Sequence, residues 1–168
     1  MNFHNGDSVM HATYGLGKIV KLEERTIYGP VMLYYAVQIG DMTVWVPADD
    51  KVDSRLRPPT QHAEFQRLRD ILSGPGDALP IDRRERKERL AEWLNDGSAE
   101  SLCRVIRSLT TLHQTKSLND SDQFMMKRAQ RALVGEWGHS LSIPAAQAEH
   151  EINHWLGLNA VEKPAKTR

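Results

Sequence analysis

The spacing of hydrophobic residues changes near residue 58 and divides the chain into two parts. From Val9 to Pro47, short runs of β-branched and aromatic residues are separated by glycines, which predicts an all-β unit. Alternate positions of one run are apolar, as in a strand that places one face on a small core: Leu33, Tyr35, Val37 and Ile39. The expected fold of this part is a Tudor-like or SH3-like β-barrel.

After Pro58 and Pro59 the apolar residues recur at helical spacing almost to the end of the chain. Asp82 and Ser98 stand where helix N-caps are expected, and the third helix carries an apolar stripe at i, i+3, i+4 and i+7. The chain is therefore expected to be α+β, with the barrel followed by an all-α bundle of about five helices. The expected boundaries are a barrel domain at 1–58, a helical domain at 60–157 and a flexible tail at 158–168.

Composition narrows the possible partners. Lys and Arg together number 22, as do Asp and Glu, so no global positive field draws the protein to nucleic acid. Any DNA contact must come from a local patch or from a partner that recruits the protein. No signal peptide or membrane-spanning run is recognisable, which predicts a cytoplasmic protein without a membrane partner. The single cysteine, Cys103, excludes an intramolecular disulfide and a cysteine-based zinc module.

One motif suggests an enzyme. His150, Glu151 and His154 form H-E-x-x-H, in which two histidines of a helix bind zinc and the glutamate activates a water molecule. Ala160 stands where the longer zinc-protease pattern has its third histidine. The apolar stripe of the same helix, which includes Ile152, lies opposite the histidines, so these should face solvent. A zinc-dependent hydrolase is therefore kept as the enzymatic alternative only.

Two groups of basic residues could contact DNA. The first opens the second helix and consists of Arg83, Arg84, Arg86, Lys87 and Arg89, and the second lies on the fourth helix and consists of Lys127, Arg128 and Arg131. They could bind backbone phosphates. In the competing interpretation, the first group is a solvated helix face with i, i+4 ion pairs such as Asp82 with Arg86. The sequence does not show whether the two helices are neighbours.

The segments GDSVMHATYGLGKIV, EERTIYGPVMLYYAVQI and DMTVWVPA resemble the RNA-polymerase-interacting domain of the CarD/CdnL family, a domain also found in transcription-repair coupling factors. The likeness continues through ALPIDRRERKERLAEWLNDGS and the later helices, over about residues 1 to 157. It implies a bacterial, non-enzymatic transcription regulator without cofactors, which acts as a monomer. Such a regulator binds the lobe of the RNA polymerase β subunit and contacts upstream promoter DNA to modulate the stability of the open complex.

The resemblance also assigns roles to residues of this chain. The family barrel pairs its edge strand with a strand of the β subunit, which here implies contacts from Trp45, Val46 and Pro47. Arg25 matches a polymerase-contacting arginine of the family. Trp45 stands where relatives often carry arginine, and both an interface position and a barrel-core position remain open for it.

The helical part departs from the family at one functional position. Relatives place a tryptophan wedge at the start of the second helix, where it enters the minor groove, and an ungapped alignment puts Arg83 there. Trp93 belongs to the expected buried side of that helix and is no substitute. A polymerase-binding adaptor without wedge activity is therefore the second alternative.

Overall fold

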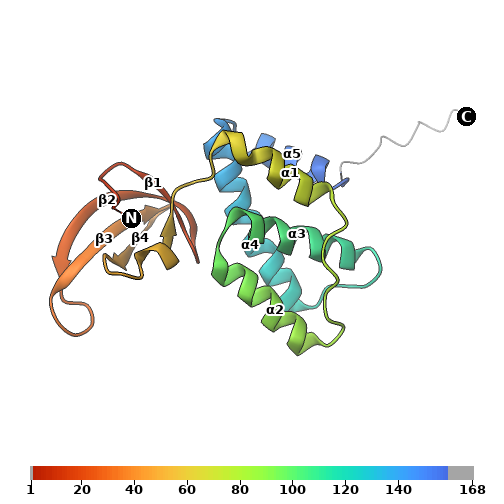
Figure 1. Ribbon diagram of the computed structural model, residues 1–168, viewed down its shortest axis with the longest axis horizontal. Coiled ribbons are helices and arrows are strands. Elements are labelled where there is room, and N and C mark those ends of the chain that lie inside the picture. The colour runs from red at the N-terminus through yellow and green to blue at the C-terminus, as the bar shows by residue number, and fades with distance from the viewer. Residues whose placement is uncertain (1, 159–168) are drawn as a thin grey trace, which may run out of the picture.

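Five antiparallel strands form the N-terminal part of the computed structural model, which describes residues 2–158 (Figure 1). They are β1 (Ser8–His11), β2 (Gly15–Arg25), β3 (Met32–Ile39), β4 (Met42–Pro47) and β5 (Leu56–Arg57). The sheet order is β4-β3-β2-β1-β5, so consecutive strands β1 to β4 are neighbours and β5 returns beside β1. The Tudor-like β part expected from the sequence is confirmed.

The strands enclose a small hydrophobic core on one face of the curved sheet. Its buried members come from alternate strand positions and from the flanking segments: Phe3, Val9, Ile19, Tyr35, Val37, Ile39, Val46, Val52 and Leu56. Tyr35, Val37 and Ile39 of β3 belong to this core as expected, whereas Leu33 is 44% exposed. Tyr34 and Ala36, which alternate with them on the other face, are buried as well. Leu33 pairs with Glu24 near the free end of the β2–β3 hairpin, beyond the reach of the core.

Five α-helices follow the sheet, as the hydrophobic periodicity predicts. They are α1 (Phe65–Ser73), α2 (Arg83–Asp96), α3 (Ala99–His113), α4 (Asp120–Leu141) and α5 (Ala145–Trp155). Asp82 and Ser98 accept backbone hydrogen bonds as the N-caps of α2 and α3, and Gly97 ends α2 with a φ of 69°. Trp93 is buried with the helical core, as expected. Among residues 2–158, no helix is long and apolar enough to span a bilayer.

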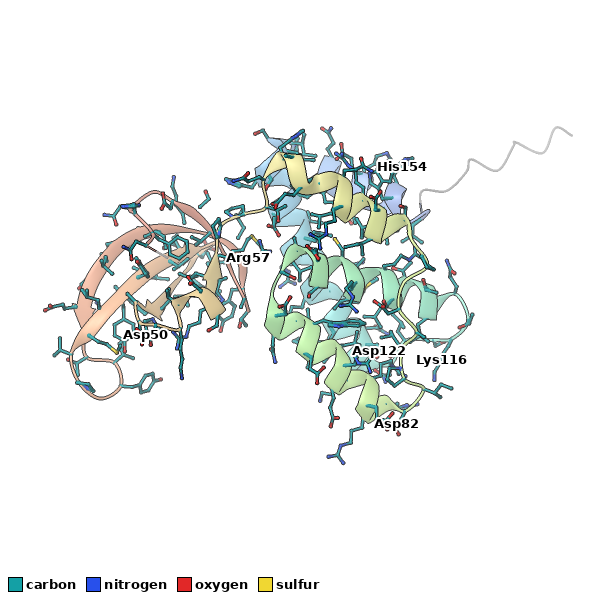
Figure 2. All side chains as sticks on the ribbon, in the orientation of Figure 1. Asp50, Arg57, Asp82, Lys116, Asp122 and His154 are labelled. Atoms are coloured by element: carbon teal, nitrogen blue, oxygen red, sulfur yellow. The ribbon has the colours of Figure 1, made fainter. Side chains whose placement is uncertain are left out.

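A buried ion pair joins the sheet to the helices. Arg57 of β5 donates from Nη1 and Nη2 to the carboxylate of Glu136 on α4, at 2.6 and 2.7 Å, and from Nε to the carbonyl of Gly97. Thr60 adds backbone and hydroxyl hydrogen bonds to the same carboxylate. Figure 2 shows Arg57 where the chain passes from sheet to helices. These bonds connect β5 and the linker after it to α4 and to the end of α2. Of the tail expected at 158–168, residues 159–168 lie outside the described residues.

Candidate functional site

Strand β4 forms one edge of the sheet. Within the described chain it pairs with β3 alone, so its outer main-chain groups face no other strand. Val46 points into the core and is 2% exposed. The residues on either side of it, Trp45 and Pro47, lie on the opposite face of the sheet. An edge of this kind can accept a further strand from a partner.

Arg25 and Trp45 are in contact on the outer face of the sheet. The guanidinium carbon of Arg25 lies 3.9 Å from the centre of the Trp45 ring, and the Lys21 ammonium lies 5.4 Å from it. Trp45 is absent from the hydrophobic core cluster, so the core interpretation of this residue does not hold. Glu23 bridges the two cations, and the hydrogen bond from Lys21 is the main cause that lowers the pKa of its carboxyl group. The edge strand is thus flanked by a cation stacked on an aromatic ring.

Four of the five residues of the first basic group lie exposed at the start of α2, and the fifth, Arg86, is buried. Arg83, Arg84, Lys87 and Arg89 are exposed, and Arg84 pairs with Glu88 at 3.4 Å. The competing interpretation expected an ion pair between Asp82 and Arg86. Asp82 instead accepts hydrogen bonds from the backbone amides of Arg84 and Glu85.

Arg86 was expected to contact DNA, and the structure contradicts this expectation. Its side chain is 1% exposed and donates two hydrogen bonds of 2.9 Å to the carboxylate of Asp122 at the start of α4. It also donates to the carbonyls of Pro80 and Ile81. The hydrogen bonds with Asp122 are the main cause that raises the pKa of Arg86. This arginine therefore ties α2 to α4, and it proves that the two helices are neighbours.

Sequence reasoning missed Ile81, whose side chain is 86% exposed directly before the N-cap Asp82. An apolar residue at this position commonly packs against the fourth residue of the helix. Here that residue is Arg86, whose side chain is committed to Asp122, so Ile81 has no apolar partner within α2. The signal available in the sequence was an apolar residue before a helix cap, followed by arginine at the stapling position.

The second basic group lies on α4. Lys127 and Arg131 are exposed. Arg128 is half-buried and donates to the carbonyl of Ala12 at 3.2 Å, across the contact between helix and sheet. Arg128 thus has a structural bond in addition to any contact with DNA.

The H-E-x-x-H motif does not form a zinc site. His150 and His154 are exposed on α5, and the carboxylate of Glu151 accepts a hydrogen bond of 2.8 Å from the indole of Trp137. Among the described residues no group of three His, Cys, Asp or Glu side chains could hold a metal ion. The arrangement leaves the hydrolase alternative without structural support.

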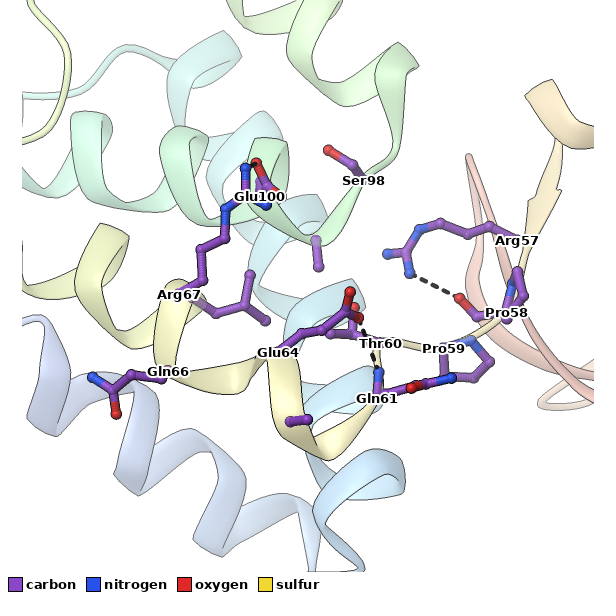
Figure 3. Close-up of a pocket in the computed structure, with 13 residues that line it drawn as sticks. Arg57, Pro58, Pro59, Thr60, Gln61, Glu64, Gln66, Arg67, Ser98 and Glu100 are labelled. Atoms are coloured by element: carbon purple, nitrogen blue, oxygen red, sulfur yellow. Dashed lines mark hydrogen bonds and ion pairs between the residues drawn. The ribbon is translucent and has the colours of Figure 1, made fainter.

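A wide hollow of about 720 Å³ lies beside the linker between β5 and α1 (Figure 3). Its charged side chains are engaged in the protein: Arg67 pairs with Glu100 at 2.9 Å, and Arg57 with Glu136. Within residues 2–158, its lining includes no histidine or cysteine, and the hydroxyl of Ser98 caps α3. The hollow therefore lacks a set of residues suited to nucleophilic or acid–base catalysis.

Comparisons with known proteins match the sheet and the helices to two separate family models. The family model described as CarD-like/TRCF RID domain matches residues 3–59, and the model of the CarD C-terminal domain matches residues 67–153. A curated protein of Bacillus subtilis (strain 168), described as "Putative transcription factor YdeB", is 26% identical over 137 residues, which cover 80% of this chain and 89% of that protein. Since family models match both its sheet and its helices, the chain belongs to the CarD family.

Proposed function

We propose that this protein is a non-catalytic transcription regulator that binds the lobe of the RNA polymerase β subunit through strand β4. The observation that carries the proposal is the free edge of β4 beside the stacked Arg25 and Trp45. A strand of the β subunit adds to this edge through main-chain hydrogen bonds, and the two side chains select the partner. Arginine and tryptophan are the residue types most often found at the energetic centre of interfaces.

The helical part contacts upstream promoter DNA once polymerase has recruited the protein. Arg83, Arg84, Lys87 and Arg89 reach backbone phosphates from the start of α2, and Lys127, Arg128 and Arg131 extend the contact on α4. Ile81 supplies the apolar group that enters a base step, beside Arg83, which the sequence alignment places at the wedge position. Recruitment by polymerase is consistent with a formal net charge of zero.

Binding to the isolated β-subunit lobe tests the polymerase contact. Arg25→Glu reverses the charge above Trp45 and is expected to weaken binding by at least about 30-fold, the effect of losing an interface hot spot of about 2 kcal/mol. Arg84→Glu is the matched control, because this side chain is 89% exposed on α2. It should leave lobe binding unchanged. Equal affinity of the Arg25→Glu variant and the natural protein would contradict the proposal.

The lifetime of the promoter open complex tests the DNA contact. Ile81→Ser should shorten the lifetime that the natural protein confers, since it removes the apolar group but preserves the N-cap at Asp82. The lifetime measured with Arg83→Ala tests whether the arginine contributes separately from the apolar side chain of Ile81. If the natural protein binds polymerase but leaves the lifetime unchanged, it is an adaptor without wedge activity.

A further inference from the structure

A groove of about 310 Å³ lies where the β1–β2 turn meets α4. Two exposed aromatic side chains belong to its lining: Tyr14 of the turn, which is 51% exposed, and Phe124 of α4, which is 69% exposed. The rest of the lining is Thr13 and the cations Lys127, Arg128 and Arg131, and none of the described residues that line the groove is acidic. The groove therefore combines two exposed aromatic rings with three cationic side chains.

The aromatic residue of the turn is held in place. The Nδ1 atom of His11 accepts hydrogen bonds from the backbone amides of Thr13 and Tyr14, at 3.0 and 3.2 Å. The His11 and Tyr14 rings lie 5.1 Å apart, and Arg128 fixes the adjoining Ala12 carbonyl. Because the turn is fixed against α4, a ligand in the groove meets a preformed surface, which lowers the entropic cost of binding.

A ligand that suits this lining has a flat apolar ring and a negative charge beside it. An unstacked nucleobase with its phosphates has both, because every base offers a π-face to an aromatic side chain and the backbone offers charge to lysine and arginine. Paired bases of a closed duplex are stacked within the helix and cannot enter such a groove.

We propose that the groove between Tyr14 and Phe124 binds an unstacked base of single-stranded DNA, while Lys127 and Arg131 contact the neighbouring phosphates. The inference rests on the proposed function and deepens it, since it names melted DNA as the partner of this surface. Tyr14 and the barrel turn thereby join the DNA contact, in addition to the start of α2.

Fluorescence anisotropy with a labelled oligothymidine and the full-length protein tests the groove. Tyr14→Ala and Phe124→Ala should each weaken binding by about 5-fold to 150-fold, the range for loss of one stacked base. Tyr14→Phe should retain binding because it keeps the ring. Tyr28→Ala is the matched control, since Tyr28 is an 85% exposed tyrosine on the β2–β3 hairpin and outside the groove. An oligonucleotide with abasic sites should bind the natural protein as weakly as the intact one binds the alanine variants.

The proposal is overturned if the abasic and intact oligonucleotides bind equally, or if Tyr14→Ala and Phe124→Ala bind as the natural protein does. It is also overturned if an oligoglutamate peptide competes as well as DNA does, because the groove then selects charge only. Duplex promoter binding in the same proteins separates this inference from the proposed function. If the alanine variants bind single-stranded DNA as the natural protein does, and the natural protein binds duplex DNA, only the groove proposal is refuted. If the natural protein binds neither single-stranded nor duplex DNA, the proposed DNA contact as a whole is refuted.

Discussion

Replacing Glu136 with alanine removes the carboxylate that joins the sheet to the helices. Glu136 is fully buried and accepts four hydrogen bonds, two from Arg57 and two from Thr60, with lengths between 2.6 and 2.8 Å. Removing one partner of a buried ion pair costs about 3–5 kcal/mol, because the other charge remains uncompensated. The Arg57 side chain is 23% exposed and keeps its bond to Gly97, so it recovers some hydration. We therefore expect a loss of about 3 kcal/mol in the free energy of unfolding.

Urea denaturation followed by circular dichroism measures this loss. With a slope of about 2 kcal/mol per molar urea, the midpoint should fall by about 1.5 M. The urea midpoint of the Glu136→Gln variant should fall less far, because the amide keeps one acceptor oxygen. Glu100→Ala is the control, since Glu100 pairs with Arg67 near the surface, and it should cost about 1 kcal/mol or less. Equal and small losses in the Glu136→Ala and Glu100→Ala variants would show that the buried pair does not hold the two parts together.

Three other predictions concern buried or partly buried groups. Arg86→Ala should lower the free energy of unfolding by about 3–5 kcal/mol, because it leaves a buried carboxylate unpaired. Lys87 is exposed, so the free energy of unfolding of the Lys87→Ala variant should stay within about 0.5 kcal/mol of that of the natural protein in the same urea titration. Similar losses in the Arg86→Ala and Lys87→Ala variants would contradict the burial of the Arg86 ion pair. Burial, and then the charge of Arg128, lower the pKa of His11 from 6.5. The folded state thus favours neutral His11, so its contribution to stability is present above pH 6.5 and is lost as the pH falls through the lowered pKa. Between pH 8 and pH 5, the thermal unfolding temperature of the His11→Gln variant should fall less than that of the natural protein. Burial raises the pKa of the Cys103 thiol, so an aromatic disulfide reagent at pH 8 should label it only after unfolding, and rapid labelling of the folded protein would refute its burial.

Local signals in the sequence were sufficient for the elements of the fold. The N-caps Asp82 and Ser98 and the glycine at position 97 act through residues within one helical turn, so they mark the ends of α2 and the start of α3 reliably. The stripe of α3 and the inward positions Tyr35, Val37 and Ile39 of β3 likewise follow from the periods of helix and strand. The same reasoning placed Trp93 in the core and the histidines of α5 outside it.

The candidate site was predicted less completely, because its residues depend on partners that are distant in the sequence. Arg86 looked like its basic neighbours, since helix geometry alone offers it Asp82, four residues away. Its actual partner is Asp122, 36 residues away, and this contact removes it from the surface. For Trp45 the sequence left interface and core open. Its position next to the inward-facing Val46 places the ring on the outer face, where Arg25 stacks on it.

The sequence by itself determined the order of the elements, the apolar stripe of α3 and the family resemblance of both parts. Only the tertiary structure decided which charges remain exposed, how Arg57 and Glu136 fix the sheet against the helices, and that Tyr14 and Phe124 share one groove. The physical reason is that periodicity and capping act within a few residues. Ion pairs such as that of Arg57 with Glu136, 79 residues apart, form only once the chain has packed.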